Sequence, residues 1–153
     1  MNDAVEIANL IYTYAEGMDL GDFEGVGALF ERAEITTDPA QGGPVRGAAA
    51  ATRMYADWTR TYPDPRSPTG RTLHTKHVTT NLQIHLAADG RSAKTRCYFT
   101  VMMQTEKLPL QPIISGRYQD EFEKVDGRWG FSRRHIITDL VGKLSEHLLL
   151  SIG

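Results

Sequence analysis

The segment from residue 113 to residue 139 constrains the fold most, because two alternating runs of residues flank a tight-turn signal. Successive side chains of a β-strand point to opposite faces, so every second residue of a run shares a face. These faces carry Ile114, Gly116, Tyr118, Asp120 and Phe122 in the first run, and Trp129, Phe131, Arg133, His135 and Ile137 in the second. Between the runs, Asp126 and Gly127 are typical of a primed turn, because Gly adopts its positive φ without strain. The sequence therefore predicts a β-hairpin.

Three helices are predicted in the N-terminal part of the chain, at residues 3–19, 22–30 and about 48–61. Apolar residues recur three and four positions apart in the first of them, as in a helix with one buried face. Asp22 is well placed to cap the second helix. Asp19 ends the first helix, where a carboxylate meets the negative end of the helix dipole. This unfavourable position suggests that Asp19 serves another purpose.

Long strands at about 72–86 and 91–104 are predicted before the hairpin, and a short strand at 34–37. Three helices followed by an antiparallel meander are typical of the α+β class, in which a sheet covers helices packed on one face. We expect a cone-shaped, curved antiparallel sheet that wraps the three N-terminal helices. The interior of such a cone is the expected ligand cavity.

The connecting segments carry further predictions within one domain that we expect to span residues 1–153. Residues 38–47 are rich in Pro and Gly and predict an irregular loop. Residues 62–70 contain three prolines and predict a rigid extended connection. A short amphipathic tail helix is predicted at about 140–150, and its Leu cluster either closes the cavity or lies in a subunit contact.

Composition argues against several classes of function. A formal net charge of −2 gives no electrostatic footprint for nucleic acid. No apolar run approaches the roughly 20 residues that span a bilayer, so no membrane partner is expected. The N-terminus, MNDAVEIANL, lacks the basic flank of a signal peptide, which predicts a cytoplasmic protein. The lone Cys97 lies at an apolar strand position and is interpreted as a small core residue.

Metal and cofactor sites find little support in the sequence. The His74-x-x-His77 spacing could begin a metal site, but residues three apart on a strand face opposite ways and no carboxylate converges there. No glycine-rich phosphate loop, nucleophile elbow or nucleotide fingerprint occurs. We therefore predict neither a metal nor a cofactor.

The hairpin also resembles the closing hairpin of SnoaL-like proteins, which have the nuclear transport factor 2 (NTF2) fold. The residues that carry this resemblance are Gly116, Tyr118, Asp120, Asp126, Gly127, Trp129 and Arg134. The superfamily includes polyketide cyclases, scytalone dehydratase, ketosteroid isomerase, hexachlorocyclohexane dehydrochlorinase and many proteins without catalysis. The resemblance implies a small, largely apolar cyclic ligand and a homodimer or homotrimer. It does not fix the chemistry, because one fold hosts unrelated activities.

The resemblance further implies an Asp–His pair. His77 lies four residues before Asn81, a spacing that recurs in SnoaL-like sequences, and Asp19 matches an aspartate at the end of the first helix. In scytalone dehydratase and the dehydrochlorinase these two positions form a buried dyad. Arg134 matches an arginine of the dehydrochlorinase pocket. Scytalone dehydratase has a tyrosine where Met18 stands and a second histidine on a later strand, where this chain has none. These differences argue against dehydration of the same substrate.

Strand alternation opposes the inward placement of His77. It puts Val78, Leu82, Ile84 and Leu86 on one face and His77 on the other. For His77 to face the pocket, either a bulge near residues 79–80 shifts the phase, or the pocket face changes along the bent strand. His74 shares the apolar phase. The remaining histidines, at positions 85, 135 and 147, are interpreted as surface or packing residues. The expected substrate-binding residues are Tyr12, Trp58, Asn81, Tyr98 and Tyr118.

These observations predict a cofactor-independent lyase or isomerase of the dehydratase, dehydrohalogenase or cyclase type. His77 would abstract a proton from carbon, Asp19 would orient the imidazole, and Arg134 would stabilise developing charge. Two alternatives stay open. The protein could be a non-catalytic module for ligand binding or assembly, or a small subunit of a larger oxygenase.

Overall fold

The structure is a computed structural model and describes residues 2–150. Its main elements are three helices and eight strands, with one 3₁₀ turn, η1 (Pro39–Gln41). The helices are α1 (Asp3–Asp19), α2 (Phe23–Ala28) and α3 (Ala48–Trp58). The strands are β1 (Glu34–Thr36), β2 (Val45–Arg46), β3 (Tyr62–Pro63), β4 (Arg71–Thr72), β5 (Thr75–Leu86), β6 (Ser92–Met103), β7 (Gln111–Val125) and β8 (Arg128–Val141).

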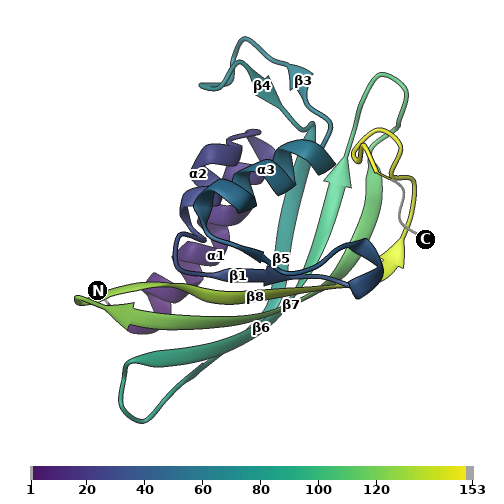
Figure 1. Cartoon of the computed structure of the whole chain (residues 1–153). Coiled ribbons are helices and arrows are strands. Elements are labelled where there is room, and N and C mark those ends of the chain that lie inside the picture. The colour runs from purple at the N-terminus through teal and green to yellow at the C-terminus, as the bar shows by residue number, and fades with distance from the viewer. Residues whose placement is uncertain (1, 151–153) are drawn as a thin grey trace.

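The helices pack on one face of a strongly curved sheet, as the α+β prediction requires (Figure 1). Six strands form this sheet in the order β2-β1-β8-β7-β6-β5, and β3 and β4 form a separate ribbon. The expected antiparallel arrangement needs one correction, because β1 pairs with β8 in parallel and the sheet is mixed. Only strands joined by a tight turn must run antiparallel, and a long stretch of chain separates β1 from β8.

The predicted hairpin is confirmed, with Asp126 at φ 52° and Gly127 at φ 77° between β7 and β8. The predicted faces hold for β7 but not for all of β8. A register shift between Glu121 and Phe122 places an extra residue in β8 after Phe131. Beyond this bulge the buried residue is Arg134, whereas Arg133 is exposed. The prediction that Arg133, His135 and Ile137 share the face of Trp129 and Phe131 is therefore wrong.

A bulge in β5 shifts the phase of that strand as well. The register with β6 breaks between Thr80 and Gln83, and Asn81 adopts a positive φ of 54°. His77 lies on the covered side before the break, and Leu82 and Ile84 lie on it after the break. Of the two ways to turn His77 inward, the bulge is therefore present, about one residue later than expected.

The predicted tail helix is wrong. β8 continues to Val141, and the segment that follows, residues 144–150, forms a turn and one bridge, Thr59 to Leu148. Ten residues are too few for a stable helix without packing. Here the backbone groups pair instead with residues at the end of α3 and just after it. Residues 38–47 also contain η1 and β2 rather than only irregular loop, and residues 62–70 begin with β3.

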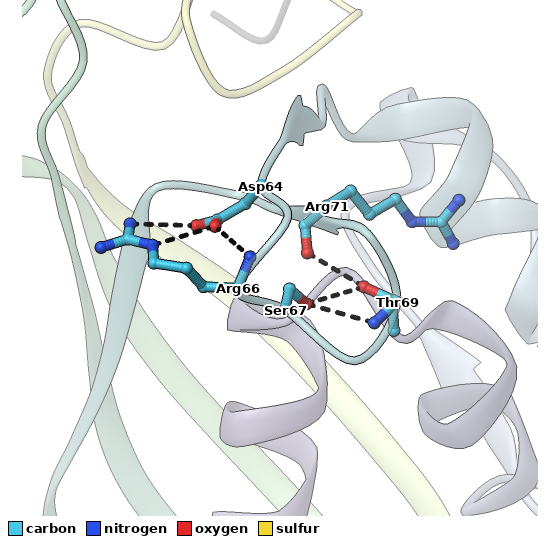
Figure 2. Close-up of polar contacts among 5 residues, drawn as sticks. All are labelled: Asp64, Arg66, Ser67, Thr69 and Arg71. Atoms are coloured by element: carbon cyan, nitrogen blue, oxygen red, sulfur yellow. Dashed lines mark hydrogen bonds and ion pairs between the residues drawn. The ribbon is translucent and has the colours of Figure 1, made fainter.

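The loop between β3 and β4 holds the C-terminal end of α1. Asp64 accepts hydrogen bonds from Arg66, and Ser67 contacts Thr69, which gives the loop its own framework (Figure 2). From this loop, the Thr69 hydroxyl donates to the Leu20 carbonyl at 2.7 Å. The backbone N–H of Leu73 donates to the Asp19 carbonyl at 3.0 Å. These bonds fix Asp19 against the start of β5.

No helix among residues 2–150 is long and apolar enough to cross a membrane.

Candidate active site

Asp19 and His77 form a hydrogen-bonded pair where α1 meets β5. Asp19 Oδ1 lies 2.6 Å from His77 Nδ1, and both carboxylate oxygens lie 3.1 Å from the backbone N–H of His77. Thr75 donates its hydroxyl to Oδ1 at 2.8 Å. These hydrogen bonds stabilise the negative charge of Asp19, which is otherwise unfavourable at the negative end of the helix dipole. A carboxylate on Nδ1 keeps the proton there and leaves Nε2 as the basic nitrogen.

The pair is largely shielded from water. The side chains of His77 and Asp19 are 7% and 14% exposed, and His77 lines a cavity of about 110 Å³. Most of the lining is apolar or aromatic, and it includes Tyr14, Met18, Trp58, Phe99 and Tyr118. A larger hollow of about 620 Å³ lies between α1 and the β7–β8 turn, away from the pair. We take the smaller cavity as the candidate site because His77 lines it. Asp19 lines a separate hollow of about 590 Å³, together with His74 and Thr75.

The structure brings only some of the expected substrate-binding residues to this cavity. Trp58 and Tyr118 line it. Tyr12 and Tyr98 are 44% and 49% exposed and lie outside it, on the outer side of α1 and on the convex face of β6. Asn81 is exposed because the bulge turns it outward. The tyrosines of the lining are Tyr118, which the sequence suggested, and Tyr14, which it did not.

Arg134 is fully buried beside the cavity, where it pairs with Asp120. Its Nε and Nη2 donate to the two carboxylate oxygens at 2.9 and 2.8 Å. Burial lowers the pKa of the guanidinium, but the charge and hydrogen bonds of Asp120 raise it by more, so Arg134 stays protonated. Its guanidinium carbon lies 3.7 and 4.2 Å from the ring centres of Tyr118 and Tyr14. Arg134 therefore lies behind two tyrosines of the cavity wall and is not itself a lining residue.

His74, the other histidine of the β5 entry, is exposed and packs edge-on against Tyr62 with ring centres 4.8 Å apart. His77 is thus the histidine of this segment that reaches the cavity.

Sequence reasoning missed His147, which was interpreted as a surface or packing residue. It is 5% exposed, it lines the cavity, and its ring centre lies 6.2 Å from that of His77. Burial, and then the charge of His77, lower the pKa of His147 to about 3, and the opposing effect of Asp19 is smaller. No sequence signal separates it from the other two histidines, because its place depends on how the tail folds back.

The tail covers the cavity through backbone contacts. The His147 carbonyl accepts from the Arg60 N–H at 2.8 Å, and Leu149 N–H donates to the Trp58 carbonyl at 2.8 Å. The Tyr62 hydroxyl donates to the Glu146 carbonyl. Leu148 and Leu150 complete the lining. These contacts fit the cover expected of the Leu cluster, and the subunit contact stays a prediction.

We expect the docking of the tail to weaken as the pH falls below about 6.5. Undocked His147 has an ordinary pKa near 6.5 and docked His147 one of about 3, so the undocked state binds more protons between these values. Docking is therefore fully stable above pH 6.5 and loses about 1.4 kcal/mol per pH unit below it. Amide hydrogen exchange of residues 144–150, corrected for intrinsic rates, measures this loss between pH 7 and pH 5. In His147→Phe the same protection should depend much less on pH, and equal dependence in both proteins would contradict the assignment.

Comparison with known proteins places the chain in a family. A model of the SnoaL-like domain matches residues 1–135. The chain belongs to the SnoaL-like family. A search of curated proteins finds no match.

Solved structures that are similar to this SnoaL-like chain share its fold. An NTF2-like protein with a cystatin-like fold from Novosphingobium aromaticivorans is 19% identical, covering 89% of this chain and 81% of its own, with a TM-score of 0.67. A protein from the same organism, proposed to be a scytalone dehydratase, is 23% identical over 90% of this chain and 85% of its own, with a TM-score of 0.67. LinA is 20% identical over 93% and 89%, with a TM-score of 0.66. At these identities the likeness establishes the fold alone.

Proposed function

We propose that this SnoaL-like protein is a cofactor-independent lyase or isomerase that acts on a small, largely apolar cyclic molecule. The observation that carries the proposal is the 2.6 Å contact between Asp19 Oδ1 and His77 Nδ1 at the wall of a mostly apolar cavity. An imidazole can take a proton from carbon when its tautomer is fixed and its cationic form is stabilised, and a shielded carboxylate does both.

In the proposed reaction, His77 Nε2 takes a proton from a substrate carbon, and the electron pair of that C–H bond forms a carbon–carbon double bond. Either a group on the neighbouring carbon leaves with its bonding pair, or the proton returns to another carbon and the double bond migrates. Asp19 stabilises the imidazolium. Arg134 acts as a positioning residue, because its charge reaches the cavity only through Tyr14 and Tyr118.

The size of the cavity supports a single-ring substrate. Its volume is about 110 Å³. An apolar cavity of roughly 150 Å³ accommodates benzene, whereas sites for drug-sized ligands measure about 300 Å³ or more. A polycyclic ligand would therefore require the tail to move. The expected homodimer or homotrimer and the cytoplasmic location stay predictions.

Exchange of carbon-bound hydrogen tests the proposal. Cyclohexanone and 2-cyclohexenone are incubated with the protein in deuterated water, and deuterium at carbon is followed by proton NMR. We expect the wild type to exceed His77→Gln by at least about a hundredfold, the scale of a positioned acid–base group. A protein that binds these probes saturably, yet exchanges no faster than His77→Gln, would instead be a binding module.

A further inference from the structure

His147 carries a buried polar atom for which the proposed proton transfer has no use. Its Nδ1 has less than 1 Å² exposed and no hydrogen-bond partner among the described residues. The backbone of His147 is fully engaged, since its N–H donates to the Leu144 carbonyl at 2.9 Å and its carbonyl accepts from Arg60. Backbone hydrogen bonds thus hold the segment in place, and the imidazole ring is not needed for this purpose.

A buried polar group without a partner costs free energy, so native proteins seldom keep one unless something else satisfies it. The ring of His147 lines the same cavity as His77, at 6.2 Å between ring centres and 60° between ring planes. Of the charged groups near it, Asp19 is occupied by His77, Thr75 and the backbone. A ligand that fills the cavity lies against the ring of His147 and can supply the partner that the described residues do not.

We propose that His147 is a substrate-binding residue that hydrogen-bonds an oxygen of the ligand, so that the ligand is a small oxygenated ring, a cyclic ketone or a ring alcohol, and not a plain hydrocarbon or halocarbon. The inference deepens the proposed function, and rests on it only for the statement that this ligand is a substrate.

The protonation state of His147 defines its role. Since the pKa of the docked imidazole is about 3, the ring is neutral at physiological pH. A neutral imidazole has one N–H donor and one acceptor nitrogen, so it can serve a carbonyl or a hydroxyl group. As His77 takes the proton next to a carbonyl, negative charge moves to the carbonyl oxygen, and a hydrogen bond from neutral His147 stabilises that oxygen without giving up its proton.

Phenol and toluene are suitable probes because they have nearly the same shape and differ by the hydroxyl group. Dissociation constants are measured by NMR titration for the wild type, for His147→Phe, which keeps a ring in place, and for His147→Asn, which keeps a polar group close to Nδ1. The useful quantity is the ratio of the phenol constant to the toluene constant, because comparing this ratio between proteins cancels the different hydration of the two probes.

We expect His147→Phe to raise this ratio roughly three- to tenfold over the wild type, the scale of one hydrogen bond. Toluene binding should be nearly unchanged, which shows that the cavity persists, and His147→Asn should restore part of the preference. An unchanged ratio in His147→Phe overturns the inference, and so does a wild type that binds neither probe.

The two proposals fail separately. If the ratio rises as expected but cyclohexanone shows no deuterium exchange above the His77→Gln level, His147 is a ligand-binding residue and the proposed catalysis fails. If exchange is fast and the ratio does not change, the catalysis stands and His147 has no part in binding the oxygen.

Discussion

Asp120→Asn should lower the free energy of unfolding by about 3–5 kcal/mol, the usual cost of breaking a buried ion pair. The substitution keeps the shape of the side chain and removes the charge that faces Arg134, whose guanidinium is fully buried. Burial raises the pKa of Asp120 above its ordinary value, and the opposing effect of Arg134 is smaller. We take Asp120 as ionised, because the guanidinium stays charged and contacts both oxygens. Urea unfolding followed by circular dichroism measures the loss.

The chain offers a matched control on its surface. Arg117 and Asp139 form the same two-bond contact, at 2.8 and 3.0 Å, with side chains 42% and 40% exposed. Asp139→Asn should change stability little, since solvent screens an exposed pair. Replacing Asp120 and Arg134 together by Leu and Met should recover most of the loss, because no unpaired charge is then buried. Equal losses in Asp120→Asn and Asp139→Asn would contradict the argument from burial.

The sequence predicted the elements whose signals are local. Asp126 and Gly127 specify the hairpin because the turn itself requires positive φ, and Asp22 caps α2 by accepting from the Gly25 N–H at 3.0 Å. The apolar stripe of α1 placed Asp19 at the end of that helix. Each of these features depends on a few neighbouring residues, so it can be predicted without knowing how the rest of the chain folds.

The phase of the long strands could not be predicted by alternation, because bulges add one residue where the sheet bends. After the β8 bulge Arg134 is buried in place of Arg133, and after the β5 bulge Leu82 takes the covered side. A bulge arises from the curvature of the whole sheet and leaves little local signal. The inward placement of His77 was therefore uncertain from the strand pattern, and only the family resemblance favoured it.

The tail was the least predictable element, since its partners lie far away in the sequence. Leu148 pairs with Thr59, and Glu146 accepts from Thr105 at 3.0 Å. The tail has an amphipathic pattern typical of a surface helix. In the structure its apolar residues line the cavity instead, which accounts for the same pattern without a helix. His147 was missed for the same reason, because a histidine becomes part of a site only through contacts that bring it there.

Asp19→Asn should lower the rate of cyclohexanone deuteration at least about a hundredfold, without unfolding the protein. The amide oxygen, in place of Oδ2, can still accept from the His77 N–H, and the amide nitrogen, in place of Oδ1, can donate to the Thr75 hydroxyl, so the local structure should persist. The amide no longer carries the negative charge that stabilises the imidazolium, and it can present an N–H to Nδ1. The proton of His77 then moves to Nε2, the nitrogen that must act as the base.

Two measurements distinguish this effect from a structural one. Nitrogen-15 NMR of the histidine rings should find the His77 proton on Nδ1 in the wild type and on Nε2 in Asp19→Asn, while the thermal midpoint changes little. Glu16→Gln removes an exposed carboxylate from the same helix and should keep the full rate. A tautomer change with an unaltered rate would mean that His77 is not the base. An unaltered tautomer and rate would mean that Asp19 does not control the ring. Only a change in both the His77 tautomer and the deuteration rate shows that Asp19 acts on the reaction through the imidazole of His77.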